Sequence, residues 1–347
     1  MQDENLADII GGSESSAISQ AHHKEDKMPT KVSQAFLLPL LIVAVLVLSA
    51  CQPTQPGETV TLKVAILPIL DVLPMVVAQQ EGLFTKHNIK VEFIPVGSAP
   101  ERDQLISAGQ ADAMVNELSS VMFLNQETIQ VQAVRFARVA TPEQALFRIL
   151  AAKDSGIQSA QDLKGVAVGV SQATIIEYLT EHLLGLEGLS DEEIKVVAVP
   201  RIPDRMSLLA SGELQAAMLP EPFSTLAAQQ GAVIVLDDTR APMQSFSLIT
   251  FRKAVLDQNP QAVRGFLAAV EEATILINAD PQKYAALMVE QNMVPAPLAE
   301  SFQVPTYPLK GVPDEAQFMD VLSWAKTKGY LSIDLAYSDS VNDSFLP

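Results

Sequence analysis

From Val60 onward the chain alternates short apolar, β-branched runs with longer amphipathic stretches. The short runs predict strands and the amphipathic stretches predict helices. The expected strands are Thr61–Leu67, Ile89–Pro95, Ala111–Val115, Val166–Val170, Ile194–Val199, Gln215–Leu219 and Phe246–Arg252. The expected helices run from Pro74 to Gly82 and over Arg102–Ala108, Thr174–Leu184, Asp204–Ala210, Pro260–Asn278, Pro281–Glu290 and Pro313–Gly329. This order predicts an α/β fold of mostly parallel sheets flanked by helices.

One helix–glycine–strand unit occurs twice, about a hundred residues apart. Leu105–Ala113 reads LISAGQADA and Leu208–Ala216 reads LLASGELQA, and each copy continues into an acidic loop that opens another helix. Chance similarity is an alternative, because small α/β units often resemble one another. The repeat favours two lobes of similar topology.

The two lobes imply a chain that crosses between them twice. We expect residues 60–145 to form the first lobe, residues 146–245 the second, and residues 246–347 to return to the first with the C-terminal helices. The crossings are placed near Gln144–Ala151 and Met243–Phe251, both of which have strand-like sequences.

Cys51, the single cysteine, follows fourteen apolar residues, Ala35–Leu48, and the small pair Ser49-Ala50. This run resembles the lipobox of bacterial lipoproteins, and Lys31 supplies the positive flank of a secretory signal. The apolar stretch is shorter than the ~20 residues that span a bilayer. A buried helix with a chance cysteine is the alternative.

We therefore expect residues 1–50 to be an N-terminal extension and signal peptide removed before Cys51, with translation starting at Met28. Lipid on Cys51 would then anchor the protein outside the cytoplasm, on the cell membrane. Residues 51–59, polar and rich in proline, read as a linker.

Charge and cysteine content exclude several functions. Residues 51–347 contain 35 acidic and 20 basic residues, a net charge of −15. Such a surface does not suit nucleic acid, which rewards clustered Lys and Arg. With no cysteine after Cys51, no internal disulfide can form. The chain has no P-loop either, so any ATP hydrolysis would belong to a partner.

Four segments in order carry a resemblance to a known family. They are Leu67-Pro68 with Ala78–Phe84, Ala108–Asp112, Asp162–Gly169 and Met218–Pro222. Together they resemble the nitrate, sulfonate and thiamine-precursor branch of the substrate-binding proteins of ABC importers. The resemblance implies a two-lobed periplasmic-binding-protein fold of type II that holds its ligand between the lobes.

The ligand site is expected beyond the carboxyl ends of the strands, where loops lead into helix N-termini. Four loops meet this description: Pro68–Pro74, Asn116–Ser120, Ser171–Thr174 and Pro220–Phe223. The candidate ligand-binding residues in them are Asp71, Asn116, Glu117, Ser119, Ser171, Gln172, Thr174, Glu221 and Phe223. No catalytic residue, metal ligand or cofactor is expected.

Three of these candidates, Asp71, Glu117 and Glu221, are carboxylates, and the four loops contain no lysine or arginine. Such a cleft would repel nitrate or a sulfonate and attract an amine or an aminopyrimidine. Carboxylates at helix N-termini also stabilise the helix dipole, which is the alternative role.

The other candidates are neutral. Ser171, Gln172 and Thr174 supply hydrogen-bonding groups, with N-capping as the alternative for Ser171. Phe223 offers a ring for stacking or for the core. Arg201 and Arg205 would reach an anion only if the cleft lies one strand further along.

The sequence thus favours a monomeric solute-binding component of an ABC importer, which delivers an amine-bearing heterocycle to a permease and its ATPase. A binding protein for nitrate- or sulfonate-type anions is one alternative, and a tethered ligand sensor is another. The related pyrimidine-forming enzymes use iron, a histidine and a cysteine-rich motif, whereas this chain keeps only His87 and His182 after Cys51. We therefore expect no enzymatic activity.

Overall fold

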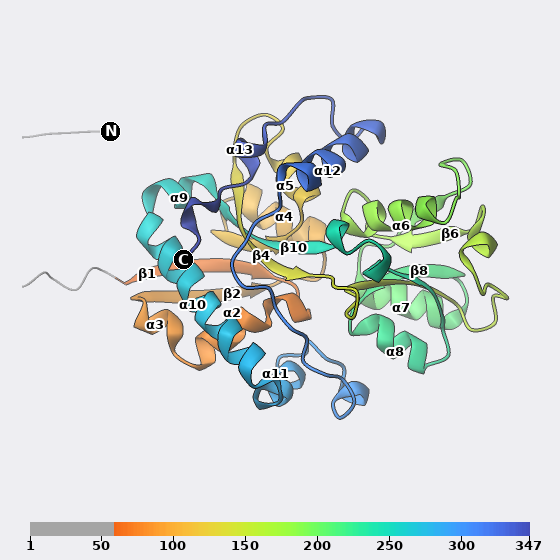
Figure 1. Cartoon of the computed structure of the whole chain (residues 1–347), viewed down its shortest axis with the longest axis horizontal. Coiled ribbons are helices and arrows are strands. Elements are labelled where there is room, and N and C mark those ends of the chain that lie inside the picture. The colour runs from red at the N-terminus through yellow and green to blue at the C-terminus, as the bar shows by residue number, and fades with distance from the viewer. Residues whose placement is uncertain (1–58) are drawn as a thin grey trace, which may run out of the picture. The chain divides into compact units, whose positions relative to one another are not determined.

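The computed structural model describes residues 59–347 (Figure 1). The expected signal peptide, Cys51 and nearly all of the 51–59 linker lie outside the described residues. Within residues 59–347, none of the helices combines the length and apolar character that crossing a bilayer requires.

The first sheet has five strands in the order β2-β1-β3-β10-β4. Strands β1, β2 and β3 run parallel, and β10 pairs antiparallel with both β3 and β4. The bounds are β1 Val60–Ile66, β2 Ile89–Pro95, β3 Ala113–Asn116, β4 Val131–Val139 and β10 Phe246–Arg252. We call this sheet and the helices packed on it the first lobe.

The second sheet repeats this arrangement with the order β7-β6-β8-β5-β9. Strands β6, β7 and β8 are parallel, and β5 pairs antiparallel with β8 and β9. The bounds are β5 Phe147–Ala151, β6 Ala167–Val170, β7 Lys195–Ala198, β8 Ala216–Pro220 and β9 Val233–Asp237. This sheet and its helices form the second lobe. The predicted α/β class is confirmed, and each sheet is mixed, with two parallel and two antiparallel strand pairings.

Two strands absent from the sequence prediction, β4 and β9, complete the outer edges of the two sheets. The chain leaves the first sheet after Val139 and enters the second at Phe147, and it returns between Asp237 and Phe246. The strand-like segments predicted as crossings are therefore largely β5 and β10 themselves. The connections between the sheets lie just before each of them.

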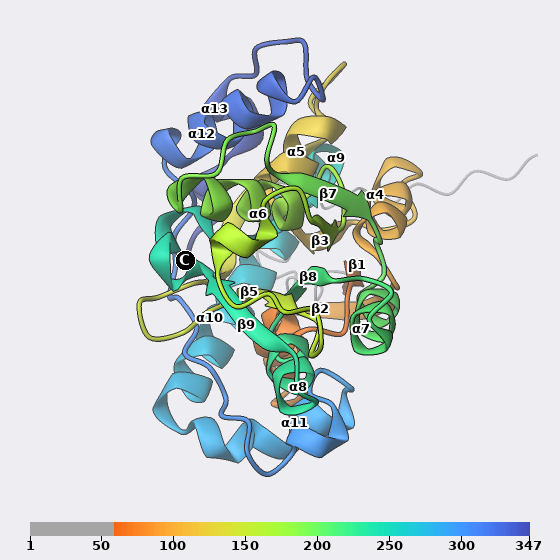
Figure 2. The same ribbon diagram turned by 90° about the vertical axis from the view of Figure 1, so that its right-hand side faces the viewer.

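Helices cover both sheets (Figures 1 and 2). Their bounds are α2 Leu73–Gln80, α3 Leu83–Lys86, α4 Ala99–Ser107, α5 Leu118–Leu124, α6 Ile175–Leu186, α7 Ile202–Ser211, α8 Phe223–Gln229, α9 Lys253–Gln258, α10 Pro260–Ala279, α11 Ala285–Glu290, α12 Glu315–Thr327 and α13 Tyr337–Ser340. The segment predicted as one helix from Pro281 begins as a 3₁₀ turn, Pro281–Tyr284, and becomes α-helical at Ala285.

Local sequence explains several helix boundaries. The Ser98 side chain caps α4 by accepting a hydrogen bond from the Glu101 amide, and the Thr174 side chain caps α6 at the Ile176 amide. Asp314 and Gln317 form a reciprocal capping box at the start of α12. These caps satisfy amides that the first helical turn leaves without partners.

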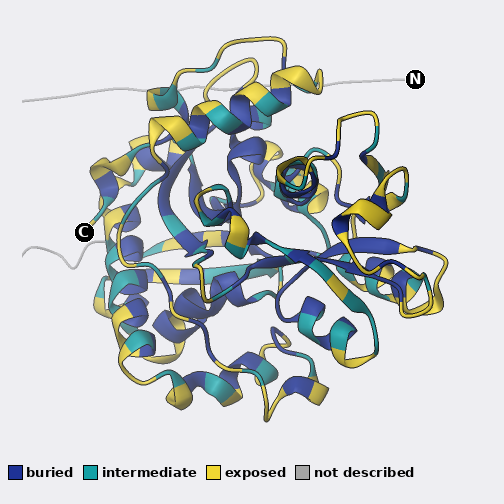
Figure 3. Cartoon of the chain, turned by 45° about the vertical axis from the view of Figure 1, so that its right-hand side comes forward, coloured by how far each residue is buried: buried dark blue, intermediate teal, exposed yellow. Residues whose placement is uncertain are grey.

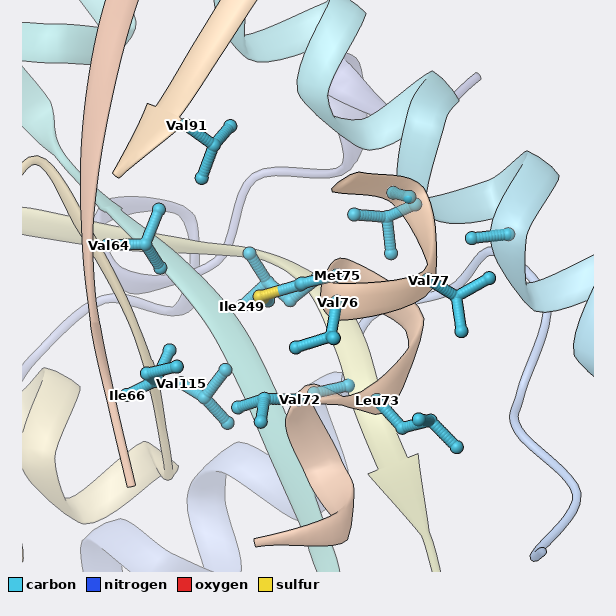
Figure 4. Packing of buried hydrophobic residues seen from close by; sticks show 14 of the residues in the cluster. Val64, Ile66, Val72, Leu73, Met75, Val76, Val77, Val91, Val115 and Ile249 are labelled. Carbon is cyan, nitrogen blue, oxygen red and sulfur yellow. The ribbon is translucent and has the colours of Figure 1, made fainter. Parts of the chain in front are cut away.

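One face of the first sheet is buried beneath α2 and α10 (Figure 4). The side chains labelled in that figure are Val64, Ile66, Val91, Val115 and Ile249 from the sheet, and Val72, Leu73, Met75, Val76 and Val77 from the 3₁₀ turn and α2. A second cluster joins the other face of this sheet to α5, α6, α12 and the second sheet. This cluster joins the two lobes, and the buried residues are dark blue in Figure 3. This packing fixes the loops that follow β1, β3 and β6.

Candidate functional site

A cavity of about 80 Å³ lies between the loops of the two sheets. Its walls are mostly apolar, and they come from both lobes. The larger apolar side chains around it are Leu67, Ile69, Phe147, Ile175, Ile176 and Ile202. Ligand sites commonly combine such walls with a few placed polar groups.

Five of the nine predicted residues line this cavity. Asp71 lies in the turn after β1, Asn116 ends β3, and Glu117 is the N-cap of α5. From the second lobe come Ser171, directly after β6, and Thr174, the N-cap of α6. The carboxyl ends of β1, β3 and β6 thus meet at one cavity, as expected for strands of open α/β sheets.

The structure places the other four predicted residues elsewhere. Ser119 lines a small adjoining pocket that shares Glu117 and Ile175 with the cavity. Gln172 is exposed, and Phe223 is half-buried at the start of α8. Glu221 is buried, but it accepts a hydrogen bond from Thr225 and pairs with Arg148. A ligand-binding role for these four stays a prediction.

Glu117 forms a buried ion pair with Arg102 of α4. The two guanidinium Nη atoms lie 3.1 and 3.3 Å from the carboxylate oxygens, and both residues are at most 5% exposed. Arg102 also donates to Asp103 Oδ1 at 2.8 Å and to the Val115 carbonyl at 3.1 Å. Burial raises the pKa of Glu117, and Arg102 opposes that shift.

Arg102 lines the cavity, and the sequence prediction missed it. It belongs to the helix that precedes β3, so a search confined to the loops after strands could not find it. One signal was present: arginines occur at matching positions in both copies of the repeat, Arg102 and Arg205.

The prediction that three unpaired carboxylates make the cleft acidic is wrong, because each of them has an arginine neighbour. Glu117 pairs with Arg102, Glu221 pairs with Arg148, and Asp71 lies 3.8 Å from Arg138. All three arginines come from helix α4 or from strands β4 and β5, outside the loops. The cleft is therefore much closer to electroneutral than three unpaired carboxylates would make it.

Asp71 retains the most open hydrogen-bonding capacity of the three acids. It accepts a hydrogen bond from the Ser247 hydroxyl, and Arg138 at 3.8 Å is beyond hydrogen-bonding distance. A carboxylate has roughly four acceptor sites. Asp71 can therefore accept further hydrogen bonds from a donor in the cavity.

The hydroxyl groups of the second lobe differ from one another. Thr174 Oγ1 donates to the Ser171 carbonyl at 2.7 Å and accepts from the Ile176 amide at 3.2 Å. Ser171 Oγ is buried and has no hydrogen-bond partner among the described residues. Because unpaired buried polar groups are costly, this hydroxyl is suited to a bound solute or water.

Neither additional arginine reaches the cavity lining. Arg201 is exposed at the start of α7, whereas Arg205 is buried and donates to the Val199 and Pro200 carbonyls. Within residues 59–347, no three His, Cys, Asp or Glu side chains gather closely enough to hold a metal ion.

Solved structures share this two-lobed arrangement, which is the periplasmic-binding-protein fold. The ligand-binding component of an ABC-type import system from Staphylococcus aureus, with zinc bound, gives a TM-score of 0.69 at 15% identity, covering 82% of this chain and 97% of the other. The alkanesulfonate-binding protein SsuA from Xanthomonas axonopodis pv. citri, bound to MOPS, also gives 0.69, at 16% identity over 82% and 99% of the two chains. Identities this low establish the fold alone.

Sequence comparison identifies the family. The profile described as NMT1/THI5 like matches residues 70–284, more than half of the chain, and the protein belongs to that family. A Haemophilus influenzae protein named for thiamine biosynthesis is 26% identical over 280 residues, covering 76% of this chain and 85% of its own. A Brucella abortus protein named as a binding protein is 24% identical over 212 residues, or 60% of this chain. The chain spans only 63% of that relative's length.

Proposed function

We propose that this protein is the solute-binding component of an ABC importer. The observation that carries the proposal is the cavity between the lobes, whose polar groups come from both sheets. A solute in this position contacts both lobes at once, so its binding favours lobe closure, as in hinge-type binding proteins. The closed form would dock on a permease that is driven by a separate ATPase.

The proposed ligand is a small amine-bearing molecule, with an aminopyrimidine-like heterocycle as the first choice. Asp71 can accept a hydrogen bond from an amine, Ser171 Oγ can pair with a ring nitrogen, and the apolar walls suit a flat ring. The name of the Haemophilus relative also points toward thiamine chemistry. Binding without chemical conversion is proposed, so the solute should be recovered unchanged.

A nitrate- or sulfonate-type anion is the second candidate, favoured by the alkanesulfonate-binding neighbour. The hydrogen-bonding groups of the lining favour an amine instead, because Asp71 can still accept hydrogen bonds. Arg102 is the single arginine or lysine in the cavity lining of the described chain, and Glu117, Asp103 and the Val115 carbonyl accept four of its five N–H groups. The two carboxylates repel an oxyanion that approaches the fifth.

A binding screen tests the ligand class. Melting temperature would be measured with 4-aminopyrimidine, methanesulfonate and nitrate, because a ligand at a hundred times Kd stabilises the fold by about 2.7 kcal/mol. Calorimetry with the best solute would follow on Asp71→Asn, with Glu271→Gln, a carboxylate that also lies beside an arginine but outside the cavity lining, as the matched control.

For 4-aminopyrimidine, Asp71→Asn should cost about 1.5–3 kcal/mol of binding free energy, because it removes a charged acceptor for the ligand's amino group. Glu271→Gln should leave the affinity unchanged. If methanesulfonate or nitrate binds tightest and Asp71→Asn does not weaken it, the amine proposal is wrong, while the solute-binding role stands.

Anchoring to the membrane by lipid on Cys51 is also proposed, on the sequence pattern alone. Cys51→Ser should move the protein from the membrane fraction to the soluble fraction without changing its melting temperature. Mass spectrometry of the wild-type N-terminus should detect acylated Cys51. Membrane-bound protein that retains residues 1–50 would contradict the proposal.

A further inference from the structure

The ligand-facing loop Ser171–Thr174 contains a backbone conformation that its residue type disfavours. Ala173 has a φ of +58°, in the left-handed region that non-glycine residues seldom occupy. Ser171 and Thr174, the two ends of this loop, both line the cavity. The position of two cavity residues therefore depends on whatever holds Ala173 in this conformation.

Glu177, in the first turn of α6, holds Ala173 in this conformation. Its Oε2 accepts a hydrogen bond of 2.7 Å from the Ala173 amide, and the residue is 1% exposed. The second support comes from the C-terminal segment: the Tyr330 hydroxyl shares its one proton between the two carboxylate oxygens, which lie 2.9 and 3.0 Å away. Lys328 Nζ lies 3.7 Å away. A single buried carboxylate thus links the ligand loop to the C-terminal segment.

The segment Glu315–Leu331, which we call the C-terminal strap, reaches both lobes (Figure 2). On the first lobe, α12 packs on α5, and the Tyr330 ring meets Phe123 edge to face at 6.0 Å between centroids. On the second lobe, Trp324 Nε1 donates to Glu181 at 2.8 Å, and Tyr178 donates to Asp320 at 2.7 Å. The carboxylate beneath the ligand loop therefore contacts a segment that is packed on the opposite lobe.

We infer that Glu177 is a positioning residue, which holds Ser171–Thr174 in its ligand-binding conformation and is itself held by Tyr330 of the C-terminal strap. The inference rests on the proposed solute-binding role of the cavity. Its structural part can be tested without a ligand.

The first experiment measures amide-resolved hydrogen exchange on the full-length protein. The reporter is the Ile176 amide, whose acceptor is the Thr174 hydroxyl. Glu177→Ala should accelerate its exchange about tenfold, because an unsupported left-handed alanine is costly. Adding Ala173→Gly should restore exchange to within about threefold, because glycine adopts this conformation without support.

Glu181→Ala is the matched control. Glu181 lies on the same helix and bonds Trp324 and Lys328 of the strap, but it makes no hydrogen bond to the ligand loop. The Ile176 amide should therefore exchange at the wild-type rate in this variant. Tyr330→Phe keeps the aromatic packing and removes only the hydroxyl, so a smaller acceleration than in Glu177→Ala is expected.

The inference is overturned if Glu177→Ala and Glu181→Ala accelerate exchange equally, or if Ala173→Gly fails to rescue the loop. A second arm measures the affinity for 4-aminopyrimidine, which should fall about tenfold in Glu177→Ala and recover in the double variant. If the wild-type protein does not bind 4-aminopyrimidine, the proposed ligand is wrong, and the exchange data still decide the role of Glu177.

Discussion

The two copies of the helix–glycine–strand repeat place an arginine at the same position with opposite surroundings. Arg102 is the fourth residue of α4, and Arg205 is the fourth residue of α7. Both are buried, with exposures of 3% and 1%. Arg102 bonds two carboxylates, whereas the hydrogen bonds that Arg205 donates go to backbone carbonyls.

Two local sequence changes account for this difference. The residue after Arg102 is Asp103, but the residue after Arg205 is Met206. Each of the two acids directly follows its strand, but Glu221 stands one residue later than Glu117 when the two copies of the repeat are aligned. Glu117 meets Arg102, whereas Glu221 pairs with Arg148 of β5. The second arginine is thereby left without a carboxylate.

The electrostatic consequences follow directly. Burial lowers the pKa of Arg205 to about 10. Burial also acts on Arg102, but Asp103 and Glu117 outweigh it and raise the pKa of that guanidinium. Arg102, whose charge is balanced by two carboxylates, therefore lines the cavity, whereas Arg205, which bonds only backbone carbonyls, does not. In the second lobe the polar contribution falls instead to the neutral loop Ser171–Thr174.

The largest expected effect on stability comes from breaking the ion pair between Glu117 and Arg102. Glu117→Ala should lower the free energy of unfolding by about 3–5 kcal/mol, because it leaves a buried guanidinium short of a partner. Glu221→Ala should cost less than about 2 kcal/mol, since the Arg148 side chain is 24% exposed and water can solvate it. Urea unfolding of both variants measures the difference; equal losses would remove the distinction between the lobes.

Asp238 in the second lobe offers a contrast with Glu117, because N–H and O–H donors hold it instead of a guanidinium. It accepts from the Leu146 and Phe147 amides and from the Ser245 hydroxyl, between the two sheets. Burial raises the pKa of Asp238 from 3.8 to about 6, although these donors and the nearby charge of Arg138 oppose the shift.

A raised carboxyl pKa gives stability that is fully present below pH 3.8 and is lost as the pH rises through about 6. The difference in unfolding free energy between wild type and Asp238→Asn should therefore change by roughly 2 kcal/mol between pH 4 and pH 7, to the disadvantage of wild type at the higher pH. Urea titrations at several pH values measure this difference. A pH-independent difference would contradict it.

The smallest expected effect on stability comes from replacing Arg205, the arginine that has no carboxylate partner. Arg205→Met should change the free energy of unfolding by no more than about 1 kcal/mol, because removal of an unpaired buried charge offsets the lost bonds to Val199 and Pro200. Arg102→Met should cost about 3–5 kcal/mol, since it leaves Glu117 and Asp103 without their partner. Similar costs for the two substitutions would show that the carboxylates are not what separates the two arginines.

Local signals in the sequence were sufficient for much of the fold. The strands Ile89–Pro95 and Phe246–Arg252 were predicted with the bounds they have in the structure. The predicted helices agree closely with the structure where a capping residue or proline marks the start, as at Thr174 and Pro260. Strands β4 and β9 were missed: β4 carries Gln132, Arg135 and Arg138 among its apolar residues, so its pattern is not that of a plain buried strand.

The sequence by itself determined the α/β class, the internal repeat and the strand-end loops that supply five cavity-lining residues. These features depend on periodicity and on helix-end chemistry, which act over a few residues. Only the tertiary structure decided the charge balance of the cleft. Arg102, Arg138 and Arg148 lie 15, 67 and 73 residues from the carboxylates they meet, and packing alone brings them together. Pairing across such separations leaves no local pattern, because either partner would look the same in the sequence if it faced solvent.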